Sequence, residues 1–147
     1  MKILMVCLGN ICRSPLAHGI MENMIQERQL PWLIDSAGTG SWHVGESPDP
    51  RAIAVARLHG IDISRQRAQH FQKDHFEQYD YILVMDNQNL KDVSALAHTS
   101  EKSNKVKLFL GDKDLSDPYY DDALFEPVYR QIEQRCKYWL DYWENLH

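Results

Sequence analysis

Apolar residues are distributed along this chain in two alternating patterns, short continuous runs and longer segments with apolar positions at helical spacing. The runs at 3–6 and 81–85 contain almost no polar side chain, which is typical of strands covered on both faces. Near the end of the chain, Val128, Ile132 and Cys136 share one helical face. The pattern predicts strands at 2–7, 33–36, 81–85 and 106–110, and helices at about 16–29, 50–59, 72–78, 87–97 and 124–142.

This alternation of strands and helices predicts the fold class. Parallel strands need crossover connections, and helices supply them on both faces of the sheet. We therefore expect an α/β fold with three layers, α/β/α, around a central four-stranded, parallel, twisted sheet. The 147 residues show no linker or internal repeat, so we expect one domain over 1–147. Ligands bind at the carboxyl ends of the strands in such sheets, and Cys7 ends the first predicted strand.

The segment that follows this strand reads C-L-G-N-I-C-R-S-P over 7–15. A strand, a tight loop and a helix N-terminus together form an anion-binding cradle of backbone N–H groups. The same positive field favours a thiolate, so Cys7 is a candidate nucleophile. Arg13 would hold two oxygens of a phosphate through its planar fork. A purely structural role explains a buried Cys7, the commoner fate of cysteine, but it does not explain the other residues at these offsets.

The remaining loop residues each fit a phosphate site. Gly9 lets the backbone approach the anion, and Asn10 tolerates a left-handed conformation. The Ser14 hydroxyl can donate to the cysteine sulfur, and Pro15 is expected at the first helical position, where a missing N–H costs nothing. Asn10, Ser14 and Ser36 are expected to hold the loop in shape through side-chain hydrogen bonds. The predicted phosphate-binding loop consists of Leu8, Gly9, Asn10, Ile11, Cys12, Arg13 and Ser14.

These motifs resemble those of the low-molecular-weight protein tyrosine phosphatases. Residues 6–15 look like the signature loop of that family, and 117–120, D-P-Y-Y, looks like its general-acid loop. The segments 35–39 and 79–86 match as well, so the resemblance covers essentially the whole chain. It implies a protein-tyrosine phosphatase that hydrolyses phosphotyrosine and small aryl phosphates through a phosphocysteine intermediate. It also implies that no metal or other cofactor is needed, because the loop and Arg13 supply the positive charge.

In-line displacement of the leaving group needs an acid opposite the nucleophile, and Asp117 is the candidate. The following Pro118 favours an extended backbone at this aspartate. The alternative is a turn residue in the acidic loop 111–122. Composition alone favours that alternative, whereas the resemblance implies the acid role. A metal site in this loop has little support, since the loop lacks the glycine and terminal glutamate of a calcium-binding loop.

Four residues are expected to line the mouth of the site, namely Trp42, His43, Tyr119 and Tyr120. A deep slot between aromatic rings would accept a phenyl phosphate and disfavour the shorter phosphoserine. The resemblance implies that Trp42 and His43 tune substrate preference. Tyr119 and Tyr120 are also candidates for phosphorylation, although a role in the pocket wall is the simpler explanation.

Cys12 has two interpretations. It is either a small buried residue that fills space under the loop, or a thiol that traps oxidised Cys7 as a disulfide. The resemblance implies the second role, and the two are compatible. A third cysteine, Cys136, is expected in the core. Many family members carry a histidine near the position of Gln66, and His59 is either a supporting residue or a helix-terminal one.

Two other functions compete with hydrolysis. A thiol-dependent arsenate reductase shares this fold and loop, but it needs two further cysteines after the central strand. Residues 80–100 contain no cysteine, so the electron path is missing. A phosphotyrosine-binding module without activity is disfavoured because the positions of the nucleophile and the acid, Cys7 and Asp117, are both filled.

Composition limits the kinds of partner and the cellular location that we expect for this protein. The apolar share of 44% and the charged share of 25% are ordinary for a globular protein, and a net charge of −5 gives no support for nucleic-acid or membrane binding. No apolar run approaches the length of a membrane span or a signal peptide. A reduced thiol is typical of the cytoplasm, where we expect this protein, as a monomer or weak oligomer. Its expected partners are phosphotyrosine proteins, a tyrosine kinase among the candidates, and its expected inhibitors are phosphate and vanadate.

Overall fold

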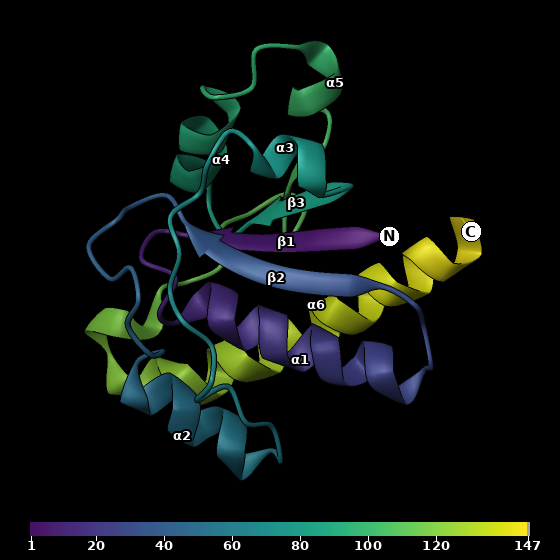
Figure 1. Cartoon of the computed structure of the whole chain (residues 1–147). Helices are drawn as coiled ribbons and strands as arrows, with labels where there is room; N and C mark the ends of the chain where they lie inside the picture. Colours follow the sequence, from purple (N-terminus) through teal and green to yellow (C-terminus); the bar gives the residue numbers. More distant parts are fainter. Residues whose placement is uncertain (147) are drawn as a thin grey trace.

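A four-stranded parallel sheet forms the centre of the molecule, which we describe from a computed structural model over residues 1–146 (Figure 1). The strand order is β2-β1-β3-β4, so β1 lies in the interior of the sheet. The carboxyl ends of β1 and β2 point to the same side, on the left in Figure 1. The strands are β1 (Lys2–Cys7), β2 (Leu33–Gly38), β3 (Tyr81–Val84) and β4 (Val106–Leu108).

Helices cover both faces of this sheet, as the alternating pattern predicts. In Figure 1, α1, α2 and α6 lie below the sheet, and α3, α4 and α5 lie above it. The three-layer α/β/α architecture is therefore confirmed. The helices are α1 (Arg13–Glu27), α2 (Pro50–Leu58), α3 (His75–Gln78), α4 (Asn87–Ser94), α5 (Ser100–Ser103) and α6 (Phe125–Leu146), with single 3₁₀ turns η1 (Pro118–Tyr120) and η2 (Asp122–Leu124) before α6.

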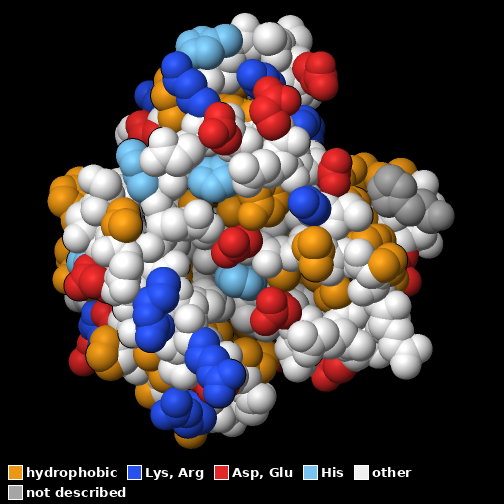
Figure 2. Space-filling view, viewed as in Figure 1, with side chains coloured by type: hydrophobic (Ala, Val, Ile, Leu, Met, Phe, Trp, Pro, Cys, Tyr) orange, Lys and Arg blue, Asp and Glu red, His pale blue; other side chains and the backbone are white. Residues whose placement is uncertain are grey.

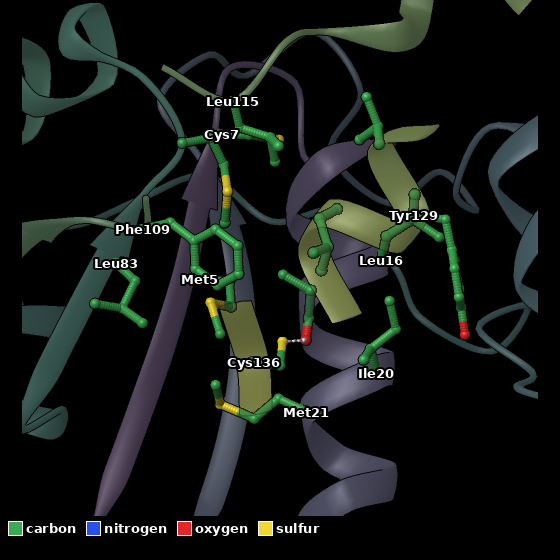
Figure 3. Close-up of a cluster of buried hydrophobic side chains, with 14 of the residues drawn as sticks. Met5, Cys7, Leu16, Ile20, Met21, Leu83, Phe109, Leu115, Tyr129 and Cys136 are labelled. Carbon is green, nitrogen blue, oxygen red and sulfur yellow. Dashed lines mark hydrogen bonds between the residues drawn. The ribbon is translucent and has the colours of Figure 1, made fainter. Parts of the chain in front are cut away.

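Side chains of β1 alternate between two hydrophobic clusters, one on each face of the sheet. Met5 and Cys7 belong to the cluster under α1 and α6, whereas Leu4 and Val6 belong to the cluster under α3 and α4. Figure 3 shows Cys7 at the end of the first cluster, beside Leu115. The nucleophile candidate is thus the last residue of a strand that is buried from Ile3 to Cys7.

Cys136, from α6, lies deeper in the same cluster, where its thiol donates to the carbonyl of Ala17 at 3.8 Å (Figure 3). It is fully buried, and this burial raises the pKa of its thiol. The expectation that Cys136 is a core residue is confirmed. Its sulfur is far along the sheet from the strand end that carries Cys7.

One predicted boundary is wrong at a place that concerns the site. Helix α1 begins at Arg13 rather than at Leu16, because the loop turns directly into the helix and Leu16 N–H already donates to the carbonyl of Cys12 at 3.2 Å. Pro15 therefore occupies the third helical position instead of the first. The missing N–H still costs nothing there, since the first turn has no intrahelical acceptors for its N–H groups.

Other boundaries differ by a few residues. Asp49 accepts from Arg51 N–H and begins α2 as predicted, and Gly60 follows that helix with a φ of +80°. Strand β2 is longer than predicted and reaches Gly38, α6 continues to Leu146, and α3 is shorter than predicted. Helix α5 was not predicted, since its four residues are too few to show a period.

The surface carries charges of both signs. On the face shown in Figure 2, arginine and lysine side chains gather over α2 and the segment that follows it, while acidic side chains are scattered elsewhere. Within residues 1–146, no helix is long and apolar enough to cross a bilayer.

Candidate active site

The loop between β1 and α1 is held against the end of β2. Thr39 N–H donates to the carbonyl of Cys7, and Gly40 N–H donates to the carbonyl of Leu8, both at 2.9 Å. The loop lies so close to Gly38 that a Cβ there would come within 2.9 Å of the Leu8 carbonyl oxygen. Asn10 adopts a φ of +57°, in the left-handed region that the sequence analysis expected for it. The close approach explains why a glycine ends β2.

Two donors face the sulfur of Cys7, whose residue is only 3% exposed. Asn10 N–H lies 3.3 Å from Sγ, and the Ser14 hydroxyl lies 3.0 Å from it. The Asn10 side-chain amide donates to Ser14 Oγ at 2.8 Å. Since that oxygen accepts from Asn10, its own proton is free to point at the sulfur. This arrangement favours negative charge on Sγ.

Asn10 is the centre of the network behind the loop. Its Nδ2 also donates to Ser36 Oγ at 3.0 Å, and its Oδ1 accepts from Gln69 N–H at 3.0 Å. The Gln69 side chain in turn donates to the Ser36 carbonyl at 2.9 Å. The structure therefore brings Asn10, Ser14 and Ser36 together, as the sequence analysis expected. It adds Gln69, which no local pattern identifies because it lies on an irregular segment far along the chain.

Arg13 is a fixed charge at the edge of the loop. It is 3% exposed, and its Nη1 donates to Asp86 Oδ2 and to the Leu115 carbonyl, both at 2.9 Å. Burial alone would lower the pKa of this guanidinium, but Cys7, Asp117 and Asp86 together hold it above its ordinary value. One side of the planar fork is thus anchored by the protein, and Nη2 remains beside Asp117.

Asp86 was part of a matching segment in the sequence analysis but had no predicted role. Its Oδ2 holds Arg13, while its Oδ1 accepts from Asn89 N–H at 2.7 Å and begins α4. It follows the carboxyl end of β3, which lies beside β1 in the sheet. Polar residues at adjacent strand ends meet in parallel sheets, and this rule is the signal that could have found Asp86.

Asp117 lines the same pocket as the loop, and its two carboxyl oxygens have different neighbours. Its Oδ1 accepts from Tyr119 N–H at 3.1 Å and begins η1, which is the turn role. Its Oδ2 lies 3.7 Å from Arg13 Nη2, with 30% of the side chain exposed. A carboxyl oxygen therefore faces the centre of the site.

A pocket of about 300 Å³ connects these groups. Trp42, His43, Tyr119 and Tyr120, the four residues expected at its mouth, all line it. His43 packs near Gly9, where a Cβ would approach its ring to 3.1 Å, and its Nδ1 pairs with Glu46 at 2.5 Å. The residues that line the pocket are Cys7, Leu8, Gly9, Ile11, Cys12, Arg13, Trp42, His43, Asp117, Tyr119 and Tyr120.

Cys12 also lines this pocket, at 4% exposure. Burial raises the pKa of its thiol strongly, and the negative charges of Asp49, Cys7 and Asp117 act in the same direction. All three cysteines are free in this structure. Cys12 is therefore a protonated thiol beside Cys7 in the same loop.

Two other residues lie outside the site. Gln66 donates to the Pro15 carbonyl at 3.1 Å and does not join the network around Asn10. His59 stacks on Tyr129 with ring centroids 4.1 Å apart and pairs with Glu126 of α6 at 2.8 Å. Of its two interpretations, the helix-terminal and structural one holds. Among the residues described, 1–146, no group of three or more histidine, cysteine or acidic side chains could hold a metal ion.

Comparisons with known proteins agree with this geometry. A sequence profile described as "Low molecular weight phosphotyrosine protein phosphatase" matches residues 2–147. The chain is 38% identical to the low molecular weight phosphotyrosine protein phosphatase of Sus scrofa, with 95% of this chain and 94% of the relative covered.

Solved structures are similar as well. A protein tyrosine phosphatase from Entamoeba histolytica, with Hepes in its active site, superposes with a TM-score of 0.92 at 31% identity over 99% of this chain and 97% of that chain. A Drosophila arginine phosphatase superposes with a TM-score of 0.89 at 32% identity over 97% and 98%.

The fold and the cysteine–arginine loop thus define a phosphoric monoester hydrolase. The chain belongs to the low molecular weight phosphotyrosine protein phosphatase family, whose activity is the hydrolysis of phosphotyrosine. The expectation from the sequence, including the preference over an arsenate reductase, agrees with this assignment.

Proposed function

We propose that this protein hydrolyses phosphotyrosine and small aryl phosphates with Cys7 as nucleophile, Arg13 as phosphate ligand and Asp117 as general acid and base. One observation carries this assignment of roles. Cys7 Sγ, with two donors aimed at it, lies in the same pocket as the guanidinium of Arg13 and the carboxyl group of Asp117. A phosphate seated in the loop has room for in-line attack between the sulfur and the acid.

In the first step, the thiolate of Cys7 attacks phosphorus and the bond from phosphorus to the phenolic oxygen breaks. Asp117, protonated at the start of this step, gives its proton to the leaving oxygen. The loop N–H groups and Arg13 stabilise the equatorial oxygens of the phosphoryl group. The products are a free phenol and a phosphocysteine.

In the second step, water attacks phosphorus and the sulfur–phosphorus bond breaks. Asp117, now a carboxylate, accepts a proton from this water. The Ser14 hydroxyl, 3.0 Å from Sγ, stabilises the departing thiolate. Inorganic phosphate leaves and the nucleophile is restored, so neither step needs a cofactor.

The lining of the pocket supports an aryl substrate. Leu8 and Ile11 contribute apolar surface, and Trp42, Tyr119 and Tyr120 contribute aromatic rings at the mouth. A phenyl ring can stack in this slot while its phosphate reaches the loop. Phosphoserine is too short to fill it, and phosphoarginine would place a cationic guanidinium where these side chains offer apolar surface.

Partners and surroundings follow from the same site. We expect phosphotyrosine proteins as substrates, tyrosine kinases among them, and competitive inhibition by phosphate and vanadate. The dependence on a reduced Cys7 supports a cytoplasmic location. We further expect residues 1–147 to act as a single domain, monomeric or weakly self-associating. His147 lies outside the described residues.

Cys12 adds a protective role to this proposal. Hydrogen peroxide would oxidise Cys7 to a sulfenic acid, which Cys12 would attack to form a disulfide and release water. The position of both thiols in one loop supports this step. Two thiols of an external reductant would then restore the active form.

The decisive experiment compares hydrolysis of p-nitrophenyl phosphate, a phosphotyrosine peptide, a phosphoserine peptide and phosphoarginine in the presence of a metal chelator. We expect turnover of the first two substrates only, with inhibition by vanadate. Preferred turnover of phosphoarginine would assign the chain the substrate of its Drosophila neighbour instead. Activity that the chelator abolishes would contradict a mechanism built on Cys7 and Arg13 alone.

A further inference from the structure

His18 ends the hydrogen-bonded chain that begins at the nucleophile. It lies on α1 at 9% exposure, and its Nδ1 is 3.2 Å from Ser36 Oγ. From Ser36 the chain continues through the Asn10 amide and the Ser14 hydroxyl to Cys7 Sγ. His18 does not line the pocket, so it can act on the reaction only through these three side chains.

The hydrogen bonds of Asn10 set the direction of this chain. Gln69 N–H is a backbone donor, so the atom of Asn10 that faces it must be the amide oxygen. Asn10 Nδ2 therefore faces Ser14 and Ser36 and donates to both of their hydroxyl oxygens. Each serine keeps one proton to donate elsewhere. The acceptors within reach of Ser14 are the cysteine sulfur at 3.0 Å and the Ala37 carbonyl at 3.5 Å, and the sulfur is the nearer. The acceptor within reach of the Ser36 hydroxyl is Nδ1 of the histidine.

This polarity fixes the tautomer of His18. Because Nδ1 accepts from Ser36, the ring proton is on Nε2, which lies 3.5 Å from the carboxylate of Glu22. The hydrogen bond from His18 is also the largest cause that lowers the pKa of Glu22, so this group is a carboxylate and a good acceptor. Neutral His18 with a proton on Nε2 therefore satisfies each group of the chain at once.

The other titratable groups around His18 come from β2 and from the start of α3. Asp35 Oδ1 lies 4.0 Å from Nδ1 and accepts from Ser36 N–H at 2.8 Å. His75 also feels the charge of Asp35, and burial lowers the pKa of that imidazole. Two carboxylates, Glu22 and Asp35, thus lie within 4.0 Å of the His18 ring.

The segment over 66–69 contributes no charge to this histidine. Gln66 and Gln69 carry neutral amides, which donate to backbone carbonyls. The guanidinium of Arg67 donates to the carbonyls of Ser64 and Gln66 on its own segment. Glu22 and Asp35 are therefore the charged groups within 4.0 Å of His18 among residues 1–146.

We propose that His18 is a positioning residue for catalysis: its neutral imidazole accepts the Ser36 hydroxyl proton and thereby keeps Asn10 and the Ser14 hydroxyl oriented toward Cys7. This inference rests on the proposed function of Cys7. When His18 is protonated, Nδ1 becomes a donor and Ser36 Oγ faces two donors. The Ser36 hydroxyl proton then has no acceptor among the contacts of residues 1–146, and the orientation of Asn10 is weakened.

The consequence is a dependence of kcat on the protonation state of His18. The neutral form is the competent one, because a proton on Nδ1 turns the acceptor of the Ser36 hydroxyl into a donor. Substrate binding depends on the loop N–H groups and Arg13, which this proton does not reach directly. The effect therefore appears in kcat more than in KM.

Two variants of nearly equal size separate the geometry from the loss of a side chain. In His18→Asn, the side-chain amide reaches the position of Nδ1 and its oxygen can accept from Ser36. In His18→Gln, the amide reaches the position of Nε2 and leaves Ser36 without its acceptor. Neither variant titrates between about pH 5 and 8, where histidine does.

The experiment measures kcat and KM for p-nitrophenyl phosphate across this pH range, with thermal melting as a check on folding. We expect His18→Gln to lose about 10-fold to 100-fold in kcat at neutral pH, with KM little changed, the range typical of residues that orient a reacting group. His18→Asn should retain kcat within about three-fold and lose one protonation step from the acid limb. Equal kcat values and an unchanged acid limb in both variants would overturn the proposal.

Ser36→Ala provides a second test that keeps His18 in place. It removes the hydroxyl that links the imidazole to Asn10, so the same acid step should vanish and addition of His18→Gln should cost little more. An acid limb that persists in Ser36→Ala would contradict the inference even if a His18 variant failed to fold. Failure of the proposed function is distinguished separately, because it would appear as turnover by Cys7→Ser or as none by the wild type.

Discussion

The floor of the pocket and its rim differ in how firmly the rest of the chain holds them. Cys7 and Arg13 belong to the floor, and Asn10 and Ser14 support it from behind; each of the four is at most 3% exposed. Asp86 and Gln69, from distant segments, hold Arg13 and Asn10. The rim is exposed, with Trp42 at 71% exposure, and its rings have few partners. Substitution in the floor therefore removes several contacts within the protein at once, whereas substitution in the rim changes only the contacts with the substrate.

Asp117 stands between these two regions. Its backbone belongs to the exposed loop before α6, yet its carboxyl group faces Arg13 of the floor. We therefore expect the floor to carry out the reaction and the rim to determine which substrate binds. Four substitutions test this division.

The largest effect is expected from Cys7→Ser. A serine hydroxyl at this position is a poor nucleophile, so kcat should fall by about 10⁴-fold or more, as on loss of other catalytic nucleophiles. Vanadate should still bind, because the loop N–H groups and Arg13 remain. Single-turnover kinetics and calorimetric titration with vanadate measure the two effects. A serine variant with substantial turnover would rule out covalent catalysis by Cys7.

Asp117→Asn should follow. Removal of a general acid costs about 10² to 10⁴-fold, and most for leaving groups that need a proton. We expect a large loss with phenyl phosphate and a smaller loss with p-nitrophenyl phosphate, whose phenolate leaves without help. A plot of log kcat against leaving-group pKa gives the result. Equal losses on both substrates would assign Asp117 the turn role only.

Arg13→Lys tests whether the shape of the fork matters as well as its charge. Lysine cannot hold Asp86 and the Leu115 carbonyl while also offering two parallel donors to a phosphate. A loss of about 10² to 10³-fold in kcat/KM is expected, as for removal of a preorganised donor to the transition state. Weaker vanadate binding should accompany it. Wild-type kinetics in this variant would show that a point charge is sufficient.

The smallest effect is expected at the rim, from Trp42→Ala. Loss of one aromatic contact is worth about 0.5–1.5 kcal/mol, so KM for a phosphotyrosine peptide should rise a few-fold. The value of kcat and the melting temperature should remain near those of the wild type. Steady-state kinetics on the peptide and on p-nitrophenyl phosphate test this. A fall in kcat as large as that of Arg13→Lys would erase the distinction between floor and rim.

The sequence predicted those parts of the fold and site that depend on local patterns. The strands of the sheet were identified because buried strands are continuous apolar runs, and the loop after Cys7 because its residues are consecutive. The start of α1 was placed too late, since the helix begins inside the anion loop, where no apolar period has yet begun.

Some residues that support the site from distant segments were not predicted. Gln69 and His18 contact Asn10 and Ser36 from two separate segments, and neither has a motif around it that identifies its role. Gln66, near whose position many family members carry a histidine, lies outside this network, because its side chain donates to the Pro15 carbonyl. Positions of this kind depend on tertiary contacts, which one sequence does not reveal.

The two oxygens of Asp86 have a practical consequence for rearranging the chain. One carboxylate both begins α4 and orients the arginine of the anion loop, so the backbone around 86–89 must stay continuous for either to persist. Circular permutation with new termini at this point would remove both the start of α4 and the anchor of Arg13. The exposed stretch 98–101, on the far side of α4, is the better place to reopen the chain.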